Sequence, residues 1–201
     1  MPDFPKTLLQ YAGAPLHPSS LDKSALVLID YQMEYLSGTL KLTGVSEALT
    51  HAKALLVLAR QKGTPVFHIV HHGRPGGALF DPDGPFVAIV PDVAPIDGEA
   101  VIRKSLPNAF AGTDLNSLIV ATGRKELILA GFMTHMCVSA TVRAALDLGY
   151  RSTVVAAATA TRDLPDPLNG TIAADILHRG SLAALADRFA VIVPDAAALA
   201  V

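Results

Sequence analysis

The sequence predicts an α/β fold with a six-stranded parallel sheet and helices on both of its faces. Short, wholly apolar segments alternate with longer segments whose apolar residues recur at helical spacing. The apolar segments lack the in–out alternation of a half-exposed strand, which indicates burial on both faces, as in parallel sheets. Right-handed crossover connections then place helices on the two sides of such a sheet.

Four prolines precede the first expected strand, so residues 1–24 are interpreted as an irregular N-terminal arm and residues 25–201 as a single domain. A chain of 201 residues is long enough for one sizeable core and short for two. The expected strands lie at 25–30, 64–70, 99–104, 126–131, 151–158 and 190–194.

Helices are expected between these strands, where apolar residues recur at intervals of three and four. The segments are 46–62, 114–121, about 136–148 and 172–186. Gly63 and Gly149 follow two of them, as glycine often does at a helix end. The stretch from 71 to 97 is rich in Gly, Pro and Asp and is too long for an ordinary connection, which indicates a functional loop.

The amino-acid composition limits the kinds of molecule that the protein is expected to bind. Apolar residues make up 51% of the chain and charged residues 17%, so part of the surface is expected to be covered by another subunit, in a homo-oligomer that is a dimer or a tetramer. The formal charge of −2 and the scattered basic residues exclude a broad nucleic-acid or membrane surface, which leaves a small molecule as the expected partner. The start, MPDFPKTLLQ, has no signal-peptide pattern, and a cytoplasmic location is expected.

Cys137 is the single cysteine, so an internal disulfide is excluded. It is expected where the strand 126–131 turns into a helix that begins near Met136, with Thr134 as the helix cap. In the first helical turn, free N–H groups and the helix dipole stabilise a thiolate and can hold an oxyanion. The alternative is a small, buried and unreactive side chain.

Two further strand ends carry polar residues. Asp30 ends the first expected strand and Lys104 the third, and in a sheet of order 3-2-1-4-5-6 the first and fourth strands are neighbours. Asp30 would then face Cys137 and act as its base, while Lys104 would pair with both anions. Taken singly, an Asp at a strand end is often a cap and a Lys is usually solvated.

Three segments together resemble the isochorismatase-like cysteine hydrolases, a group that includes nicotinamidases, N-carbamoylsarcosine amidases and ureidoacrylate hydrolases. The segments are DYQ at 30–32, KS…AF…T.L at 104–115 and GFMTHMCVSATVRAALDLGY at 131–150. The likeness extends from about Ala25 to Pro194. It implies a three-layer Rossmann-like fold and a catalytic triad of Asp30, Lys104 and Cys137.

The resemblance also implies local geometry and chemistry at the turn. The peptide bond between Phe132 and Met133 would be cis, and the N–H groups of Met133 and Cys137 would form an oxyanion hole. The implied reaction is hydrolysis of a C–N bond in a small amide, carbamoyl or ureido substrate through a thioester. The presence of the cysteine argues against the vinyl-ether reaction of isochorismate hydrolysis.

No metal and no other cofactor is expected. Nicotinamidases bind a metal through an Asp-x-His after the second strand, but here that segment reads HIVHHGRPGG. On a strand, His68 and His72 would be ~13 Å apart, and His71 and His72 would point to opposite sides. Nucleotide-binding patterns such as GxGxxG are also absent from the sequence.

Four residues near the expected triad are candidates for substrate binding, with core packing as the alternative for the aromatic ones. They are Gln32, Tyr35, His72 and Phe110. Two other functions stay open at this stage. Cys137 could serve a non-catalytic redox or ligand sensor, or the chain could be an oligomeric scaffold in which the triad is accidental.

Overall fold

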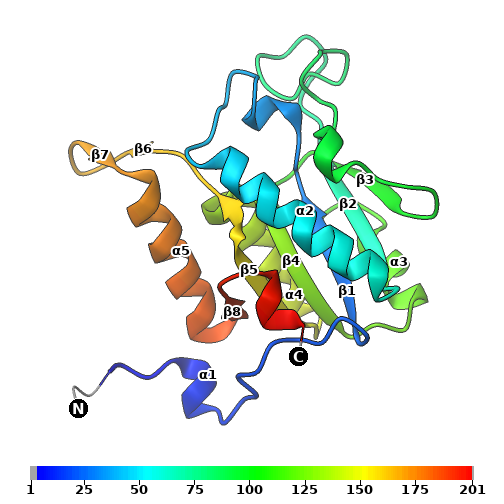
Figure 1. Cartoon of the computed structure of the whole chain (residues 1–201). Helices are drawn as coiled ribbons and strands as arrows, with labels where there is room; N and C mark the ends of the chain where they lie inside the picture. Colours follow the sequence, from blue (N-terminus) through cyan, green and yellow to red (C-terminus); the bar gives the residue numbers. More distant parts are fainter. Residues whose placement is uncertain (1–3, 201) are drawn as a thin grey trace.

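The computed structural model describes residues 4–200 and shows the predicted parallel sheet (Figure 1). Its strand order is β3-β2-β1-β4-β5-β8, so the predicted order 3-2-1-4-5-6 is confirmed, with β8 as the sixth strand. Every neighbouring pair is parallel. The strands are β1 (Ser24–Ile29), β2 (Val66–His71), β3 (Ala100–Lys104), β4 (Glu126–Phe132), β5 (Arg151–Ala160) and β8 (Val191–Val193).

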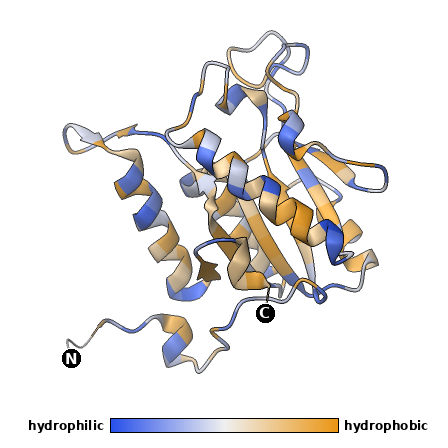
Figure 2. Ribbon diagram, viewed as in Figure 1, coloured by the Kyte–Doolittle hydropathy of each residue, from blue (hydrophilic) through white to orange (hydrophobic). Residues whose placement is uncertain are grey.

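Helices cover both faces of the sheet, as predicted. They are α2 (Val45–Gln61), α3 (Leu115–Ala121), α4 (Ser139–Asp147) and α5 (Ala174–Arg188). Side chains of β1 alternate between two cores: Leu26 and Leu28 pack with α2, whereas Val27 and Ile29 pack with α3, α4 and α5. The apolar colouring of the sheet between helices with polar outer faces shows the same layering (Figure 2).

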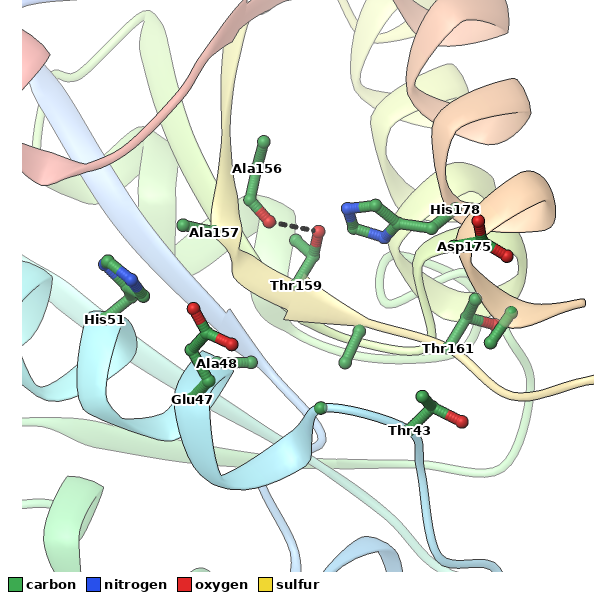
Figure 3. A pocket seen from close by; sticks show the side chains of 13 residues that line it. Thr43, Glu47, Ala48, His51, Ala156, Ala157, Thr159, Thr161, Asp175 and His178 are labelled. Atoms are coloured by element: carbon green, nitrogen blue, oxygen red, sulfur yellow. Dashed lines mark hydrogen bonds between the residues drawn. The ribbon is translucent and has the colours of Figure 1, made fainter.

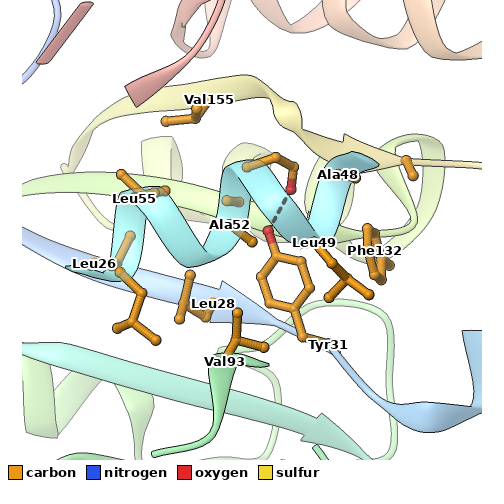
Figure 4. Packing of buried hydrophobic residues seen from close by; sticks show 14 of the residues in the cluster. Leu26, Leu28, Tyr31, Ala48, Leu49, Ala52, Leu55, Val93, Phe132 and Val155 are labelled. Carbon is orange, nitrogen blue, oxygen red and sulfur yellow. Dashed lines mark hydrogen bonds between the residues drawn. The ribbon is translucent and has the colours of Figure 1, made fainter. Parts of the chain in front are cut away.

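The core under α2 contains Tyr31, whose hydroxyl donates to the backbone oxygen of Ala158 (Figure 4). At this point β5 departs from regular pairing, because its register with β4 shifts between Leu129 and Gly131. Across this shift β5 has more residues than β4. After it, pairing resumes and β5 continues to Ala160, two residues beyond the predicted end. The Tyr31 hydrogen bond satisfies one carbonyl that the irregularity exposes.

Two segments expected to be irregular contain short regular elements. In the arm, α1 (Leu8–Tyr11) is a four-residue helix with a capping box between Thr7 and Gln10, which explains why helix forms among so many prolines. The turn-rich segment after β5 forms a hairpin of β6 (Leu164–Pro165) and β7 (Thr171–Ile172). Residues 1–3 of the expected arm lie outside the described residues.

The carboxyl ends of β1, β3 and β4 lie at one edge of the sheet. The long connection between β2 and β3 begins at the same edge, because it follows the carboxyl end of β2. That connection holds only a 3-10 turn, Pro91–Val93, as regular structure. A second 3-10 turn, Met33–Tyr35, follows β1, and a last one, Ala196–Leu199, packs on α2. None of the helices in residues 4–200 has the length and apolar composition needed to cross a bilayer.

Candidate active site

Asp30, Lys104 and Cys137 converge at this edge of the sheet. Lys104 Nζ lies 2.7 Å from Asp30 Oδ2 and donates a hydrogen bond to Cys137 Sγ at 3.3 Å. The three residues are at most 5% exposed. Because β2 separates β3 from β1, Lys104 starts ~10 Å from the β1 backbone and uses its long side chain to cross that gap.

Asp30 follows β1 in a left-handed backbone conformation, with φ of 53°. Its N–H donates to Ile69 O, which ties the turn to β2. Both carboxylate oxygens are buried, and neither receives a hydrogen bond from the described residues, although Lys104 is in ion-pair contact. Burial raises the pKa of Asp30, and the charge of Lys104 opposes that rise. A buried carboxylate with free lone pairs can accept a proton.

Cys137 is a thiol in this environment, which corrects the expected thiolate. Burial, followed by the charge of Asp30, raises the pKa of Cys137 to about 12 despite the contact with Lys104. Cys137 is 5% exposed. Nucleophilic attack from this site therefore requires transfer of the thiol proton to a base, and Asp30 is the neighbouring candidate.

The turn that holds Cys137 also differs from the expected capped helix. Residues Thr134–Val138 form a π-helical turn before α4, and Val138 N donates to Met133 O at 3.2 Å. Thr134 is not the cap: its hydroxyl donates to Ala160 O at 3.1 Å and lies 2.9 Å from His178 Nδ1. Thr134 therefore ties the turn to β5 and α5 instead of satisfying N–H groups of the turn.

The peptide bond between Phe132 and Met133 is cis, as the resemblance implied. Met133 is 6% exposed, and within residues 4–200 its N–H donates to no backbone or side-chain acceptor. A buried N–H without a partner is costly and is therefore a candidate donor for a substrate oxygen.

His71 is a neighbour of the triad that the sequence interpretation considered only as a metal ligand. Its Nδ1 lies 3.2 Å from Lys104 Nζ, and its ring packs edge-on against Phe80 at 5.0 Å. Burial, together with the charge of Lys104, lowers the pKa of His71 to about 4, so the imidazole is neutral and Nδ1 accepts from the ammonium. The sheet register, which pairs His71 with Lys104, was the signal that could have found it.

The four expected substrate-binding residues lie in different surroundings. Gln32 is fully buried, and its amide bonds to the backbone of His71 and Val87, so it fastens the long loop to β2. Tyr35 packs edge-on against Phe80 and Phe132. Burial and then the charge of Asp30 raise the pKa of Tyr35.

Within residues 4–200, the side chains of the other two candidates make no hydrogen bond or ion pair with those of the triad. The N–H of His72 donates to Lys104 O, and its side chain points to the face of β2 opposite to that of His71. Phe110 stacks on Tyr150 with ring centroids 6.0 Å apart. Tyr150 precedes β5 and therefore lies at the amino edge of the sheet, away from the strand ends that carry the triad.

The histidines after the start of β2 are not arranged as a metal site. His68 Nε2 lies 2.9 Å from Glu99, which also binds Arg60, while His71 contacts Lys104. Across residues 4–200, no three His, Cys, Asp or Glu side chains form a group that could hold a metal ion.

Comparisons with known proteins agree with this architecture. The isochorismatase domain matches residues 24–196. A secreted isochorismatase effector of Verticillium dahliae is 34% identical over 181 residues, 90% of this chain and 93% of the relative. A streptothricin hydrolase of Streptomyces noursei is 36% identical over 177 residues, 87% of this chain and 63% of the relative.

Two proteins of Pseudomonas putida are also similar. Its maleamate amidohydrolase is 34% identical over 149 residues, 66% of this chain and 70% of the relative. The crystal structure of an isochorismatase from strain KT2440 superposes with a TM-score of 0.93 at 44% identity, covering 98% of this chain and 100% of the other. On the domain match and these relatives together, the chain belongs to the isochorismatase family.

Proposed function

We propose that this protein is a cysteine hydrolase that cleaves the C–N bond of a small amide, carbamoyl or ureido substrate. The observation that carries the proposal is the double contact of Lys104, with Asp30 on one side and Cys137 on the other, inside a buried site. Relatives named streptothricin hydrolase and maleamate amidohydrolase support hydrolysis of a non-peptide C–N bond.

In the first half of the reaction, Asp30 takes the proton of the Cys137 thiol as the sulfur attacks the substrate carbonyl carbon. The carbonyl oxygen becomes an oxyanion, and the N–H groups of Met133 and Cys137 donate to it. As the C–N bond breaks, Asp30 returns the proton to the departing nitrogen. A thioester on Cys137 and a free amine or ammonia remain.

In the second half, water attacks the thioester carbon and gives a proton to Asp30. The C–S bond then breaks, and Asp30 returns that proton to the sulfur, so the thiol and the carboxylate are restored. The Lys104 ammonium stabilises whichever partner is negative, because it contacts both. His71 accepts from the same ammonium and fixes its position.

We propose that no metal takes part. Of the two histidines on β2, His71 contacts Lys104 of the triad and His68 contacts Glu99, so neither is free to coordinate an ion at the triad. The alternative of a redox sensor is disfavoured because the chain has no second cysteine to resolve an oxidised Cys137. Burial also raises the pKa of the Cys137 thiol.

The aromatic neighbours limit the substrate to a small one. Tyr35 and Phe80 pack on each other with ring centroids 5.2 Å apart, and Phe80 also contacts His71. Because His71 in turn contacts Lys104, we expect a compact, planar carbonyl compound to bind near these rings after a small movement of the loop that carries Phe80.

The test is ammonia release from maleamate, N-carbamoylsarcosine, ureidoacrylate and nicotinamide, with and without a chelator. We expect turnover of at least one substrate, unchanged by the chelator and abolished by Cys137→Ser. Turnover that disappears on chelation would refute the metal-free mechanism. Full turnover by Cys137→Ser would refute the role of the sulfur.

A further inference from the structure

A cavity lies on the far side of the Thr134 turn from the triad, at the open edge of β5. It has a volume of about 380 Å³ and lies between α2, β5 and the start of α5 (Figure 3). Asp30, Lys104 and Cys137 do not line it. The cavity exists because β8 pairs with β5 only from Thr153 to Val155, which leaves the carboxyl half of β5 without a neighbouring strand.

The imidazole of His178 presents a hydrogen-bond acceptor to this cavity. The Thr134 hydroxyl donates its single hydrogen to Ala160 O. The contact of 2.9 Å between Thr134 Oγ1 and His178 Nδ1 therefore requires a hydrogen on Nδ1. Burial lowers the pKa of His178, which favours the neutral ring. In the neutral ring with Nδ1–H, Nε2 carries a lone pair, and the ring reaches from α5 into the cavity (Figure 3).

Other polar groups of the wall offer acceptors, and Thr43, His51 and Thr161 also line the cavity. Thr159 donates its hydroxyl hydrogen to Ala156 O at 2.8 Å, which leaves the lone pairs of Thr159 Oγ1 available. Glu47 on α2 and Asp175 on α5 supply carboxylates, and no Lys or Arg among residues 4–200 lines the cavity. Alanines of β5, such as Ala157, form an apolar floor.

We propose that this cavity binds a small primary amine in its ammonium form. An ammonium group brings three donors and a positive charge, which complements the His178 lone pair, the Thr159 hydroxyl and the carboxylate of Glu47. A short alkyl chain matches the alanine floor and the volume of the cavity. A neutral alcohol would leave the carboxylate charge unmatched, and a carboxylic acid would be repelled by it.

The bound amine would be linked to the turn that carries Cys137. His178 binds Thr134, and Thr134 directly follows Met133, the residue whose N–H is without a partner within the described chain. A ligand on His178 Nε2 is therefore separated from the Met133 backbone by one side-chain contact. Amine binding itself does not depend on the proposed hydrolysis, because none of the triad residues takes part.

The experiment is isothermal titration calorimetry of the full chain at low ionic strength with three probes of the same shape: butylammonium, 1-butanol and butyrate. We expect saturable, one-to-one binding of butylammonium alone. Glu47→Gln should raise Kd about three- to fivefold, the scale of an exposed ion pair. His178→Asn keeps a donor for Thr134 but removes the acceptor, and should raise Kd about tenfold.

Two control variants locate the binding. Asp97→Asn removes an exposed carboxylate from the loop before β3 and should leave Kd unchanged. Cys137→Ala should also leave it unchanged, so failure of the hydrolase proposal would not affect this result. The inference would be overturned by equal binding of 1-butanol, by an unchanged Kd in both Glu47→Gln and His178→Asn, or by loss of binding in Cys137→Ala. It would equally be overturned if sedimentation showed a dimer that buries His178 and binds no amine.

Discussion

Lys104 Nζ and Asp30 Oδ2 lie 2.7 Å apart with both side chains fully buried. Neither Asp30 oxygen receives a well-directed hydrogen bond from the described chain, so the ammonium charge is the main compensation for the buried carboxylate. Removing one member of such a pair leaves an uncompensated charge in the interior, whereas removing both does not. The pair therefore links the stability of the fold to the chemistry of the site.

The first prediction concerns this pair. Lys104→Met should abolish hydrolysis and lower the free energy of unfolding by about 3–5 kcal/mol, because Asp30 loses its counter-charge. Urea denaturation followed by circular dichroism measures the change. The double variant Asp30→Asn with Lys104→Met should recover most of the lost stability and stay inactive. Strictly additive losses in the double variant would show that the two side chains do not interact.

The second prediction concerns the close approach of β4 to β1 just before the Met133 turn. Gly131 has φ of 139°, and a Cβ at this position would lie 2.1 Å from Ile29 O. Gly131→Ala should therefore cost more than about 4 kcal/mol of stability or prevent folding. Gly149→Ala is the matched control: its φ is 83° but nothing lies within 4 Å, so we expect a loss of about 1–2 kcal/mol. Equal losses in the two variants would contradict this interpretation of β4.

The third prediction is a pH profile of kcat/KM. The general base must be ionised, and burial raises the pKa of Asp30 above the ordinary value of 3.8. The acid limb of the profile should therefore lie at higher pH than 3.8, with circular dichroism at each pH as a control for unfolding. An acid limb at or below that value, with the fold intact, would exclude Asp30 as the base.

The fourth prediction is an acid dependence of stability. His71 has a folded pKa of about 4 against an ordinary 6.5, so between these values the unfolded chain binds more protons and stability falls as pH decreases. One such proton contributes a slope of at most about 1.4 kcal/mol per pH unit. His71→Asn should flatten the pH dependence of the unfolding free energy, measured by urea denaturation between pH 6.5 and 4. An unchanged slope would mean that the pKa of His71 is the same in the folded and the unfolded chain.

Glu99 should cause a separate loss of folding stability at lower pH. Burial raises its pKa, but hydrogen bonds from Arg60 and His68 outweigh that effect and lower the pKa to about 2 from 4.5. The folded chain then holds fewer protons than the unfolded chain across this window, so stability falls as pH decreases from 4.5 to 2. Glu99→Gln should remove this dependence in the same measurements, and its persistence would assign the acid loss to other carboxylates.

The sheet was predictable because each strand is a continuous apolar run and each helix has an apolar face. That pattern predicted a parallel sheet, and with the assumed strand order 3-2-1-4-5-6 it placed Asp30, Lys104 and Cys137 at one edge, which the structure shows. Strand ends differ from the predicted ones by one or two residues because backbone pairing with the neighbouring strand, not the apolar run, decides where a strand ends; β5 reaches Ala160 because it pairs with Phe132 of β4.

The details of the site depended on contacts that no local pattern encodes. The hydroxyl of Thr134 is suitable for a cap, but the carbonyl of Ala160, distant in sequence, takes its hydrogen. The Gln32 amide donates hydrogen bonds to the backbone oxygens of His71 and Val87. The Phe110 ring stacks on Tyr150. Cys137 remains a thiol because burial outweighs Lys104, and the degree of burial is known only from the folded chain.

The most direct test of the account is the covalent state of Cys137 during turnover. Rapid acid quench of the protein with a hydrolysed amide, followed by intact-mass and peptide analysis, should reveal a mass increase equal to the acyl group on the peptide that contains Cys137. Cys137→Ala should show neither the adduct nor hydrolysis. Undiminished hydrolysis by Cys137→Ala, with no adduct on the native protein at any quench time, would contradict the account.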